Sequence, residues 1–292
     1  MAEDLSERPR DLLVSGHVNV DRFLQVERFP EPDRTVPLRG NRAELGGTAG
    51  NVARVAARFG VATGLVARVG GEFPASFESE LASAGIDLRG LVRVAAVPTP
   101  ICYIIEDRRG SQRTLIDQGP MGGDLEEASL PGPWLKEYSW LHLATGDPAF
   151  QLRLAAAARA EGVKVAADPA QEIHYRWDRR RFRALVRGSE ILFGNASEVE
   201  RAVDYVGAAD VDGLLVHVPL VVRTEGSAGA TAFSRAGALH VPAARPRRVR
   251  SEVGAGDAFR GGFYAGWFAG RPLAECLRAG TRASARWIEG LR

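Results

Sequence analysis

The chain has 292 residues, of which 45% are hydrophobic, and its 38 Lys and Arg nearly balance its 36 Asp and Glu, for a formal net charge of +2. This length and composition predict a globular protein with a substantial core, which we interpret as a single domain over residues 1–292. The near-neutral charge argues against nucleic acid as a partner, although arginines cluster at residues 179–183 and 245–250.

Neither secretion nor membrane insertion is expected. Residues 1–10 are charged and lack the apolar core of a signal peptide, and no apolar run approaches the length of about 18 residues that a membrane span needs. Cys102 and Cys276 lie far apart without metal-ligand spacing, so neither a metal cluster nor a disulfide framework is indicated. We expect a cytoplasmic protein with no membrane partner.

The first predicted elements are strand, loop and helix. An apolar run that ends in glycine predicts a buried strand over residues 12–16, and alternating side chains predict an exposed or lid strand over residues 20–26. A short strand is expected at residues 36–38. A helix follows, opened by the glycines at 46–47 and closed by Gly60.

Most of the remaining chain alternates strands with helices, which is typical of a mostly parallel sheet covered by helices on both faces. The predicted strands cover residues 65–69, 140–144, 163–167, 191–193 and 220–223, and the predicted helices cover residues 76–84, 149–160, 179–186, 197–206, 258–269 and 273–288.

One hairpin interrupts this alternation. Apolar runs at residues 101–106 and 113–117 flank a short polar turn, a pattern that predicts two antiparallel strands. With the two early exposed strands they would form a small second sheet, inserted at about residues 18–42 and 99–118. Such a sheet suits a lid that keeps water from a substrate site, and its exposed edges would allow a homodimer through the lid.

A glycine-rich turn at residues 254–257 carries the most informative chemistry. Gly254 and Gly256, with Ala255 between them, let the backbone turn tightly and direct N–H groups at an oxyanion, next to the positive end of the following helix. Asp257 at this place is suited to take a proton from an attacking hydroxyl, as in phosphoryl transfer. The alternative is that Asp257 only caps the helix.

Further candidate residues follow other predicted strands, where open α/β sheets bind ligands. Asn19 and Asp21 can hold the hydroxyl groups of a polyol, or else belong to a turn with a solvated carboxylate. Gly46 and Gly47 let the backbone approach a ligand, and Asn51 can donate and accept hydrogen bonds at once. The alternative for this second group is a plain glycine-opened helix.

Two more groups complete the set. Asn195 and Glu198 can order water around Mg²⁺, or else cap a helix in which Glu198 complements the dipole. Thr224, Gly226 and Gly229 form a loop able to wrap the phosphate and ribose of a nucleotide, or else a hairpin turn.

These motifs occur in the order found in the ribokinase-like (PfkB) carbohydrate and nucleoside kinases, which the chain resembles over about residues 12–288. The resemblance implies a ribokinase-like three-layer α/β/α domain with a mostly parallel central sheet and a small β-sheet lid. It implies ATP and Mg²⁺, with transfer of the γ-phosphoryl group to a hydroxymethyl group of a sugar or nucleoside. Asp257 matches the catalytic base, the N–H groups of residues 254–256 match the anion hole, and Asn195 with Glu198 match the pair that governs Mg²⁺ and phosphate.

The chain departs from the family just before this turn. Members usually carry Asp-Thr where this chain has Ser251, Glu252 and Val253. In the family that Asp helps to bind a monovalent cation, so potassium activation is in question here, with Glu252 or Arg250 as replacements. The base and the backbone donors remain, so catalysis is still expected. The same departure supports the alternative of a non-catalytic ligand-binding or scaffold protein on this fold.

The acceptor is left open between two classes. Asp168 and Gln171 are similar to an Asp-Pro-x-Gln stretch of prokaryotic nucleoside and adenosine kinases, which places both in the substrate site and slightly favours a nucleoside. A base needs an apolar or aromatic slot, and the lid residues offered for it, or for the lid's own core, are Phe23, Ile101, Tyr103 and Ile116. A sugar or sugar phosphate, as in ribokinase, fructokinase or KDG-kinase types, would instead use the lid arginines Arg39, Arg42, Arg108, Arg109 and Arg113.

Overall fold

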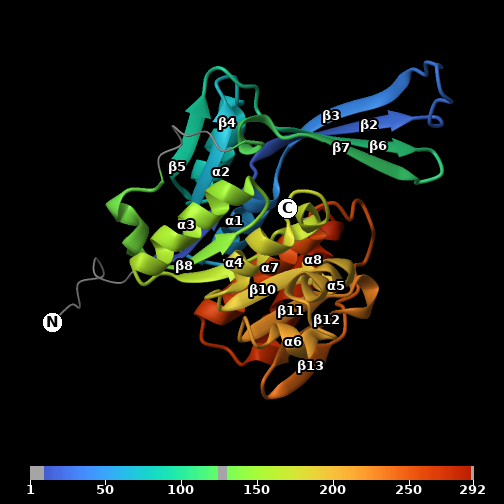
Figure 1. Cartoon of the computed structure of the whole chain (residues 1–292). Helices are drawn as coiled ribbons and strands as arrows, with labels where there is room; N and C mark the ends of the chain where they lie inside the picture. Colours follow the sequence, from blue (N-terminus) through green and yellow to red (C-terminus); the bar gives the residue numbers. More distant parts are fainter. Residues whose placement is uncertain (1–9, 124–129, 291–292) are drawn as a thin grey trace.

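In the computed structural model, which describes residues 10–123 and 130–290, a large body carries a lid that stands out from it (Figure 1). The body contains a nine-stranded sheet and the lid a separate sheet of four strands. The charged N-terminal segment that argued against a signal peptide lies, apart from Arg10, outside the described residues. Among the described helices, none combines the length and apolar character that crossing a membrane requires.

The large sheet runs in the order β13-β12-β11-β10-β9-β8-β1-β4-β5. Neighbours from β11 through to β5 are parallel, and only β12 and β13 join antiparallel at one edge, which confirms the expected mostly parallel sheet. The strands are β1 (Arg10–Ser15), β4 (Thr63–Gly70), β5 (Asp87–Val94), β8 (Tyr138–Leu143), β9 (Lys164–Ala167), β10 (Ile191–Asn195), β11 (Leu220–Thr224), β12 (Ala230–Ser234) and β13 (Gly237–Val241).

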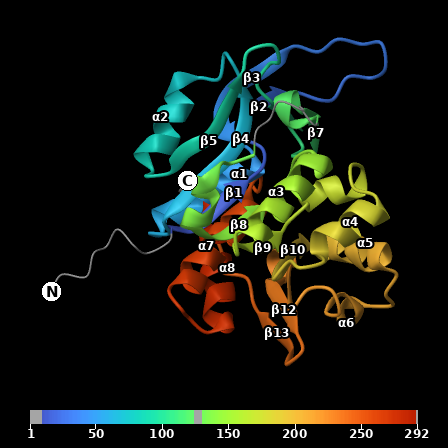
Figure 2. The same ribbon diagram turned by 60° about the vertical axis from the view of Figure 1, so that its left-hand side comes forward.

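Helices cover both faces of this sheet, as Figure 2 shows for α3, α4 and α5 on one side and α7 and α8 on the other. Side chains of the buried strand β1 alternate between the two cores, Leu12 and Val14 in one and Leu13 in the other. The three-layer α/β/α architecture is therefore confirmed. The helices are α1 (Thr48–Arg58), α2 (Ala75–Ser83), α7 (Ala255–Phe268) and α8 (Leu273–Ile288) on one face, and α3 (Pro148–Ala160), α4 (Arg179–Val186), α5 (Ala196–Val206) and α6 (Val211–Leu214) on the other.

The lid sheet has the order β3-β2-β6-β7, with β2 (Asn19–Val26), β3 (Leu38–Gly46), β6 (Ile101–Asp107) and β7 (Gln112–Asp117). The hairpins β2–β3 and β6–β7 are antiparallel, and β2 pairs with β6 in parallel. Because β1 leads directly into β2 and β3 leads directly into α1, the lid is anchored beside the carboxyl end of β1.

Two local predictions need correction, and one strand was missed. The strand expected at residues 36–38 is wrong, since β3 begins only at Leu38, after Pro37, which has no N–H for a ladder. Helix α7 begins at Ala255 rather than at residue 258, because Gly254 adopts a left-handed φ of 80° and ends the loop there. Strand β5 was not predicted, because its many polar side chains hide the pattern of a sheet-edge strand.

Candidate active site

A cavity of about 470 Å³ lies between the large sheet and the lid. Its walls include Asn195 at the end of β10, Thr224 at the end of β11 and Thr145 just after β8, so the carboxyl ends of the parallel strands open into it. The lid contributes Ile104 and Ile116 from β6 and β7. This is the place where open α/β sheets bind ligands.

Asp257 lies in the first turn of α7 and lines this cavity. Asn51, in the first turn of α1, donates a hydrogen bond from Nδ2 to Asp257 Oδ2 at 2.9 Å. Burial raises the pKa of Asp257 to about 7, against the Asn51 hydrogen bond and the Arg260 charge, which lower it. The helix cap is Gly254 and not Asp257, so the capping interpretation of Asp257 is wrong.

Arg260 forms a buried ion pair behind this carboxylate. Its Nε and NH2 groups donate to the two oxygens of Asp168 at 2.6 and 3.0 Å, and NH1 donates to the Gly256 carbonyl at 3.0 Å. Asp168 is 3% exposed and is not among the residues that line the cavity; its assignment to the substrate site stays a prediction. A bidentate pair holds the guanidinium rigidly, so Arg260 fixes the first turn of α7.

The backbone N–H groups of residues 254–256 differ in whether they are already hydrogen-bonded or lie at the cavity. The Ala255 N–H donates to the Glu252 carbonyl at 3.0 Å, and Ala255 does not line the cavity, whereas Gly254 and Gly256 do. A Cβ on Gly254 would lie 3.0 Å from both Asn51 Nδ2 and the Trp287 indole. The glycine is therefore required for its positive φ and for the close contact with Asn51.

A carboxylate and an amide lie side by side at the start of β2. Asn19 Nδ2 donates to Asp21 Oδ1 at 2.6 Å, and both line the cavity. Gly46 and Gly47 pass close to them: a Cβ on Gly46 would lie 2.2 Å from the Asp21 carboxylate, and one on Gly47 would lie 2.3 Å from the His17 carbonyl. Gly46 thus makes room for Asp21, while Gly47 itself lines the cavity.

Asn195 and Glu198 form a capping box at the start of α5. Asn195 Oδ1 accepts from the Glu198 N–H at 2.9 Å, and Glu198 Oε2 accepts from the Asn195 N–H at 2.7 Å. The capping interpretation is confirmed, and both side chains also line the cavity. Burial raises the pKa of Glu198 above its usual range.

These groups fit a bound Mg²⁺ through its waters. The described residues hold no cluster of three or more His, Cys, Asp or Glu suited to a metal. Mg²⁺ seldom needs such a cluster, since it usually binds one or two carboxylates, several waters and the phosphates of the substrate. Glu198 supplies one buried carboxylate at the cavity wall, with the Asn195 amide beside it.

In the loop after β11, one part lines the cavity and the other forms the turn into β12. Thr224 and Gly226 line the cavity. Gly229 does not: its φ is 116°, and a Cβ there would lie 2.1 Å from the Val241 carbonyl, so it serves the turn into β12. The hairpin interpretation is therefore confirmed by the antiparallel pairing of β11 with β12, and only the first part of the loop reaches the cavity.

The lid residues expected to hold a base are mostly placed elsewhere. Of the four proposed, only Ile116 lines the cavity, whereas Cys102 and Ile104 of β6 do so in place of Ile101 and Tyr103. Alternate residues of a strand face opposite sides, so on β6 the predicted face was wrong by one residue, whereas Phe23 is paired with Ile104 and does not line the cavity itself. None of the five lid arginines lines the cavity either; of these, Arg39, Arg42, Arg108 and Arg113 contact Glu27, Phe23 or Phe29.

Several residues at the cavity were not predicted from the sequence. His17 and Thr145 lie 2.8 Å apart between Nδ1 and Oγ1, and Glu172 lines the cavity one residue after the predicted Gln171. Arg260 lies one helical turn after Gly256, but its partner Asp168 lies 92 positions earlier, so the sequence alone does not indicate the pair. No local signal marks Thr145, whose role depends on β8 lying beside β1.

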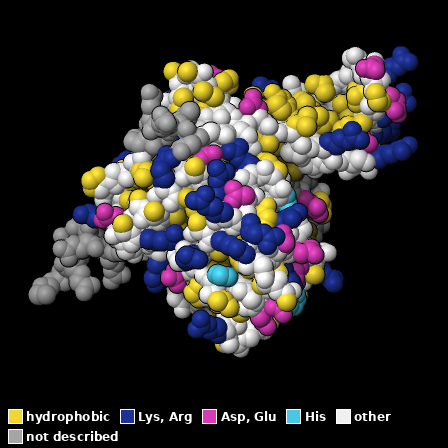
Figure 3. Space-filling model, in the orientation of Figure 1, with side chains coloured by type: hydrophobic (Ala, Val, Ile, Leu, Met, Phe, Trp, Pro, Cys, Tyr) yellow, Lys and Arg dark blue, Asp and Glu magenta, His cyan; other side chains and the backbone are white. Residues whose placement is uncertain are grey.

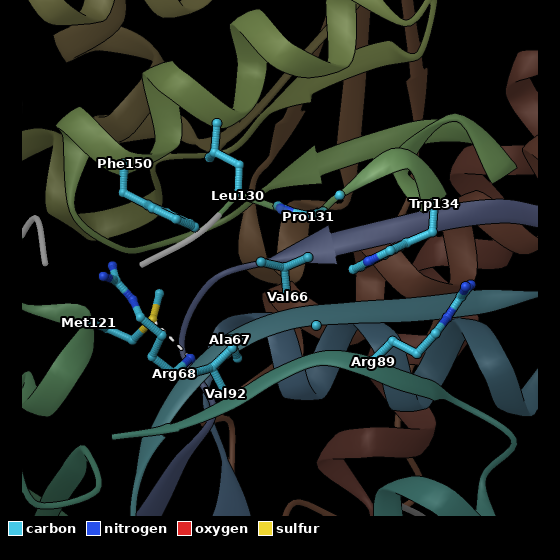
Figure 4. A pocket seen from close by; sticks show the side chains of 12 residues that line it. Val66, Ala67, Arg68, Arg89, Val92, Met121, Leu130, Pro131, Trp134 and Phe150 are labelled. Carbon is cyan, nitrogen blue, oxygen red and sulfur yellow. Dashed lines mark hydrogen bonds between the residues drawn. The ribbon is translucent and has the colours of Figure 1, made fainter. Parts of the chain in front are cut away.

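A second, smaller cavity of about 180 Å³ shares no lining residue with the first. Figure 4 shows Phe150 and Leu130 across it from Arg68 and Met121, with Trp134 and Arg89 at its other end. Arg68 lies 4.4 Å from the Phe150 ring centre, and Arg89 binds Asp87 and Glu137. This cavity has mostly apolar walls and holds none of the residues that surround Asp257.

The fold and the first cavity together define a phosphotransferase that acts on an alcohol group: a three-layer α/β/α body, a β lid and a buried carboxylate at a glycine-opened helix N-terminus. Residues 9–289 match the family described as pfkB family carbohydrate kinase. The chain therefore belongs to this kinase family.

Relatives agree with this assignment. The chain is 33% identical to a nucleoside kinase of Methanothermobacter thermautotrophicus, over 99% of this chain and 91% of the relative. It is 32% identical to an ATP-dependent ribose-1-phosphate kinase of Halopiger xanaduensis, over 88% of this chain and 84% of the relative. The crystal structure of the Methanocaldococcus jannaschii nucleoside kinase superposes with a TM-score of 0.89 at 26% identity and covers 97% of this chain and 93% of its own.

Proposed function

We propose that the protein is an ATP-dependent nucleoside kinase, which transfers the γ-phosphoryl group to the hydroxymethyl group of a nucleoside. The observation that carries the proposal is Asp257, a carboxylate at a helix N-terminus, facing the cavity with a pKa raised to about 7 by burial. A base with a pKa near the working pH combines proton affinity with a large ionised fraction. Its nucleoside acceptor is supported by the relatives and by the cavity walls.

Asp257 takes the proton of the acceptor hydroxyl in this mechanism. The hydroxyl oxygen forms a bond to the γ-phosphorus in line, the bond between that phosphorus and the β–γ bridging oxygen breaks, and ADP leaves with the electron pair. The N–H groups of Gly254 and Gly256 face the charge that spreads over the transferred group. Asn51 holds the Asp257 carboxylate in place.

The two ends of the cavity bind the two substrates. Asn19 and Asp21 are suited to the ribose hydroxyls, and Gln171 lines the same cavity. Asn195, Thr224 and Gly226 are suited to the nucleotide donor. Mg²⁺, held through water by Glu198 with Asn195, would screen the phosphate charges; the protein's own part is to keep these two groups in the capping box.

The cavity walls favour a nucleoside over a sugar phosphate. A phosphate on the acceptor would need free cationic side chains, and the only Lys or Arg in the described lining is Arg260, which is bound to Asp168. The lid instead presents Cys102, Ile104 and Ile116, which suit the face of a base.

An assay of ADP formation with ATP and a panel of acceptors tests the proposal. The panel contains nucleosides, ribose, fructose and ribose 1-phosphate, and ³¹P NMR of the product locates the new phosphate. We expect turnover with nucleosides and a product phosphorylated on the hydroxymethyl group. Turnover of ribose 1-phosphate without any nucleoside, or binding of a nucleoside without turnover, would contradict it and favour a sugar-phosphate kinase or a non-catalytic protein.

Two further parts of the proposal concern assembly and location. Leu38 and Leu115 on the lid are 52% and 62% exposed, and Figure 3 shows an apolar area on this arm. With the free edges of β3 and β7, this area supports a homodimer formed through the lid, which light scattering would detect as twice the chain mass. The use of ATP and the two free cysteines, Cys102 and Cys276, support a cytoplasmic location.

A further inference from the structure

Three polar side chains with no part in the transfer step gather at one end of the cavity. His17 follows β1, Gln118 follows the lid strand β7, and Glu172 lies in the short 3-10 helix η3 (Ala170–His174). His17 and Glu172 are 2% and 1% exposed, and both line the cavity. We call these three residues the polar cluster.

The buried members of the polar cluster are held firmly on one side. His17 Nδ1 lies 2.8 Å from Thr145 Oγ1, which in turn lies 2.6 Å from Thr48 Oγ1. Glu172 Oε2 accepts from the Gly146 N–H at 2.6 Å. Burial lowers the pKa of His17 to about 4, so its ring is neutral near pH 7.

One polar atom of each group lacks a hydrogen-bond partner of standard length and angle. His17 Nε2, Gln118 Oε1 and Glu172 Oε1 are buried and form no hydrogen bond within the part of the chain that the structure describes. Burial raises the pKa of Glu172 to about 7. Hydrogen-bonding contact with the Gln118 amide lowers the pKa of Glu172 and raises that of His17, so this amide faces both. Leaving buried polar atoms unpaired is costly, and at a cavity wall a ligand that supplies the missing partners explains them.

A series of neighbouring side chains connects the transfer site to the polar cluster. Asp21 of β2 is paired with Cys102 of β6 in the lid sheet, and both line the cavity together with Asp257. Tyr175 lines the same cavity as Cys102, and its hydroxyl lies 3.5 Å from Gln118 Nε2. A nucleoside with its hydroxymethyl group at Asp257 and its ribose hydroxyls at Asp21 therefore directs its base toward the polar cluster.

We propose that the polar cluster reads the edge of the base and selects nucleosides that carry an exocyclic amino group beside an unprotonated ring nitrogen, as in cytidine and adenosine. This inference rests on the proposed nucleoside kinase function. Glu172 Oε1 and Gln118 Oε1 are acceptors for the two amino hydrogens, and a neutral His17 can donate from Nε2 to the ring nitrogen while Nδ1 accepts from Thr145.

The same donors and acceptors disfavour two other ligands: a base without the amino group, and a phosphate group. In uridine and inosine an oxygen replaces the amino group, so this acceptor would face the two acceptors Glu172 Oε1 and Gln118 Oε1. The adjacent ring nitrogen carries a hydrogen, so this donor would face the donor His17 Nε2. A phosphate group would bring negative charge against the buried Glu172, while Arg176, whose charge lowers the pKa of Glu172, is already paired with Asp147 at 3.3 Å. Both would leave the polar cluster unpaired.

The test compares kcat/KM for cytidine with uridine and for adenosine with inosine, in the wild-type protein and in Glu172→Gln. The wild type should prefer the amino nucleoside of each pair by about tenfold or more, the effect of one unpaired buried group. In Glu172→Gln the amide oxygen can still accept from Gly146, which turns the –NH₂ toward the base. The preference should then fall by about tenfold or reverse.

Glu161→Gln, the same change at an exposed position after α3, is the matched control and should keep the wild-type ratios. Equal use of both members of each pair by the wild type, or an equal loss toward all four nucleosides in Glu172→Gln, overturns the inference while leaving the kinase function intact. No turnover of any nucleoside overturns the proposed function itself. If Glu172→Gln does not fold, Gln118→Met, which removes one acceptor, must reduce the wild-type preference, and an unchanged preference overturns the inference.

Discussion

Replacing Asp257 with Asn is expected to abolish the reaction and stabilise the fold at once. The asparagine keeps the size of the side chain, and its Oδ1 can accept the hydrogen bond that Asn51 now gives to Asp257. It cannot take a proton from the acceptor, so kcat should fall by about 10²–10⁴. Binding of the nucleoside should remain close to that of the wild type.

The gain in stability follows from the raised pKa. The Asp257 pKa shifts from 3.8 to about 7 on folding, which corresponds to a cost of about 4 kcal/mol once the group is ionised in both states. The folded pKa lies above the unfolded one. The cost is therefore absent below the unfolded value, grows between pH 3.8 and about 7, and is complete above it. Asparagine does not incur it.

Thermal denaturation of both proteins from pH 4 to pH 8 measures this difference. The variant should melt at nearly the wild-type temperature at pH 4 and higher, by the order of 5 °C, at pH 8. The wild-type kcat/KM should rise with pH up to about 7 and then level off, as Asp257 loses its proton. A variant with the wild-type rate, or a stability difference that does not depend on pH, would refute the reasoning.

Three other outcomes are expected. Asn51→Ala removes the hydrogen bond that lowers the pKa of Asp257, so the acidic limb of the kcat/KM profile should move to higher pH; an unmoved limb would count against it. Asp168→Asn leaves the buried Arg260 guanidinium without its anion and should cost about 3–5 kcal/mol in denaturant unfolding, whereas a loss within error would mean that the pair is dispensable. Because Glu252 is exposed and lies outside the cavity lining, exchanging K⁺ for Na⁺ should leave kcat unchanged, and strong K⁺ activation would contradict this.

Sequence reasoning succeeded where chemistry and local geometry coincide. The turn at residues 254–257 needs glycine for its positive φ and an acid beside it, and both are visible in the sequence. The strand and helix alternation follows from hydrophobic periodicity, which made α4 and α8 predictable to the residue.

It failed where a side chain's role is decided by a distant partner. Asp168 follows a strand, as ligand-binding residues often do, but both of its oxygens accept hydrogen bonds from Arg260. No residue near Asp168 in the sequence indicates this ion pair. The lid shows a second kind of failure. Successive side chains of β6 point to opposite faces of the lid sheet, and both faces carry apolar side chains. The sequence therefore does not show whether Ile101 or Cys102 lines the cavity.

The hydrogen bond between Asn51 and Asp257 also sets the time at which the protein becomes active during synthesis. It joins residues 206 positions apart, and the Arg260–Asp168 contact spans 92. Such long closures are late events in folding, and a chain emerging from the ribosome has its lid and most of its central sheet before α7 exists. Until α7 docks, Asp168 lacks the Arg260 guanidinium that binds both of its oxygens. A chain that ends before α7 therefore lacks both Asp257 and this ion pair, and is expected to be inactive and less stable.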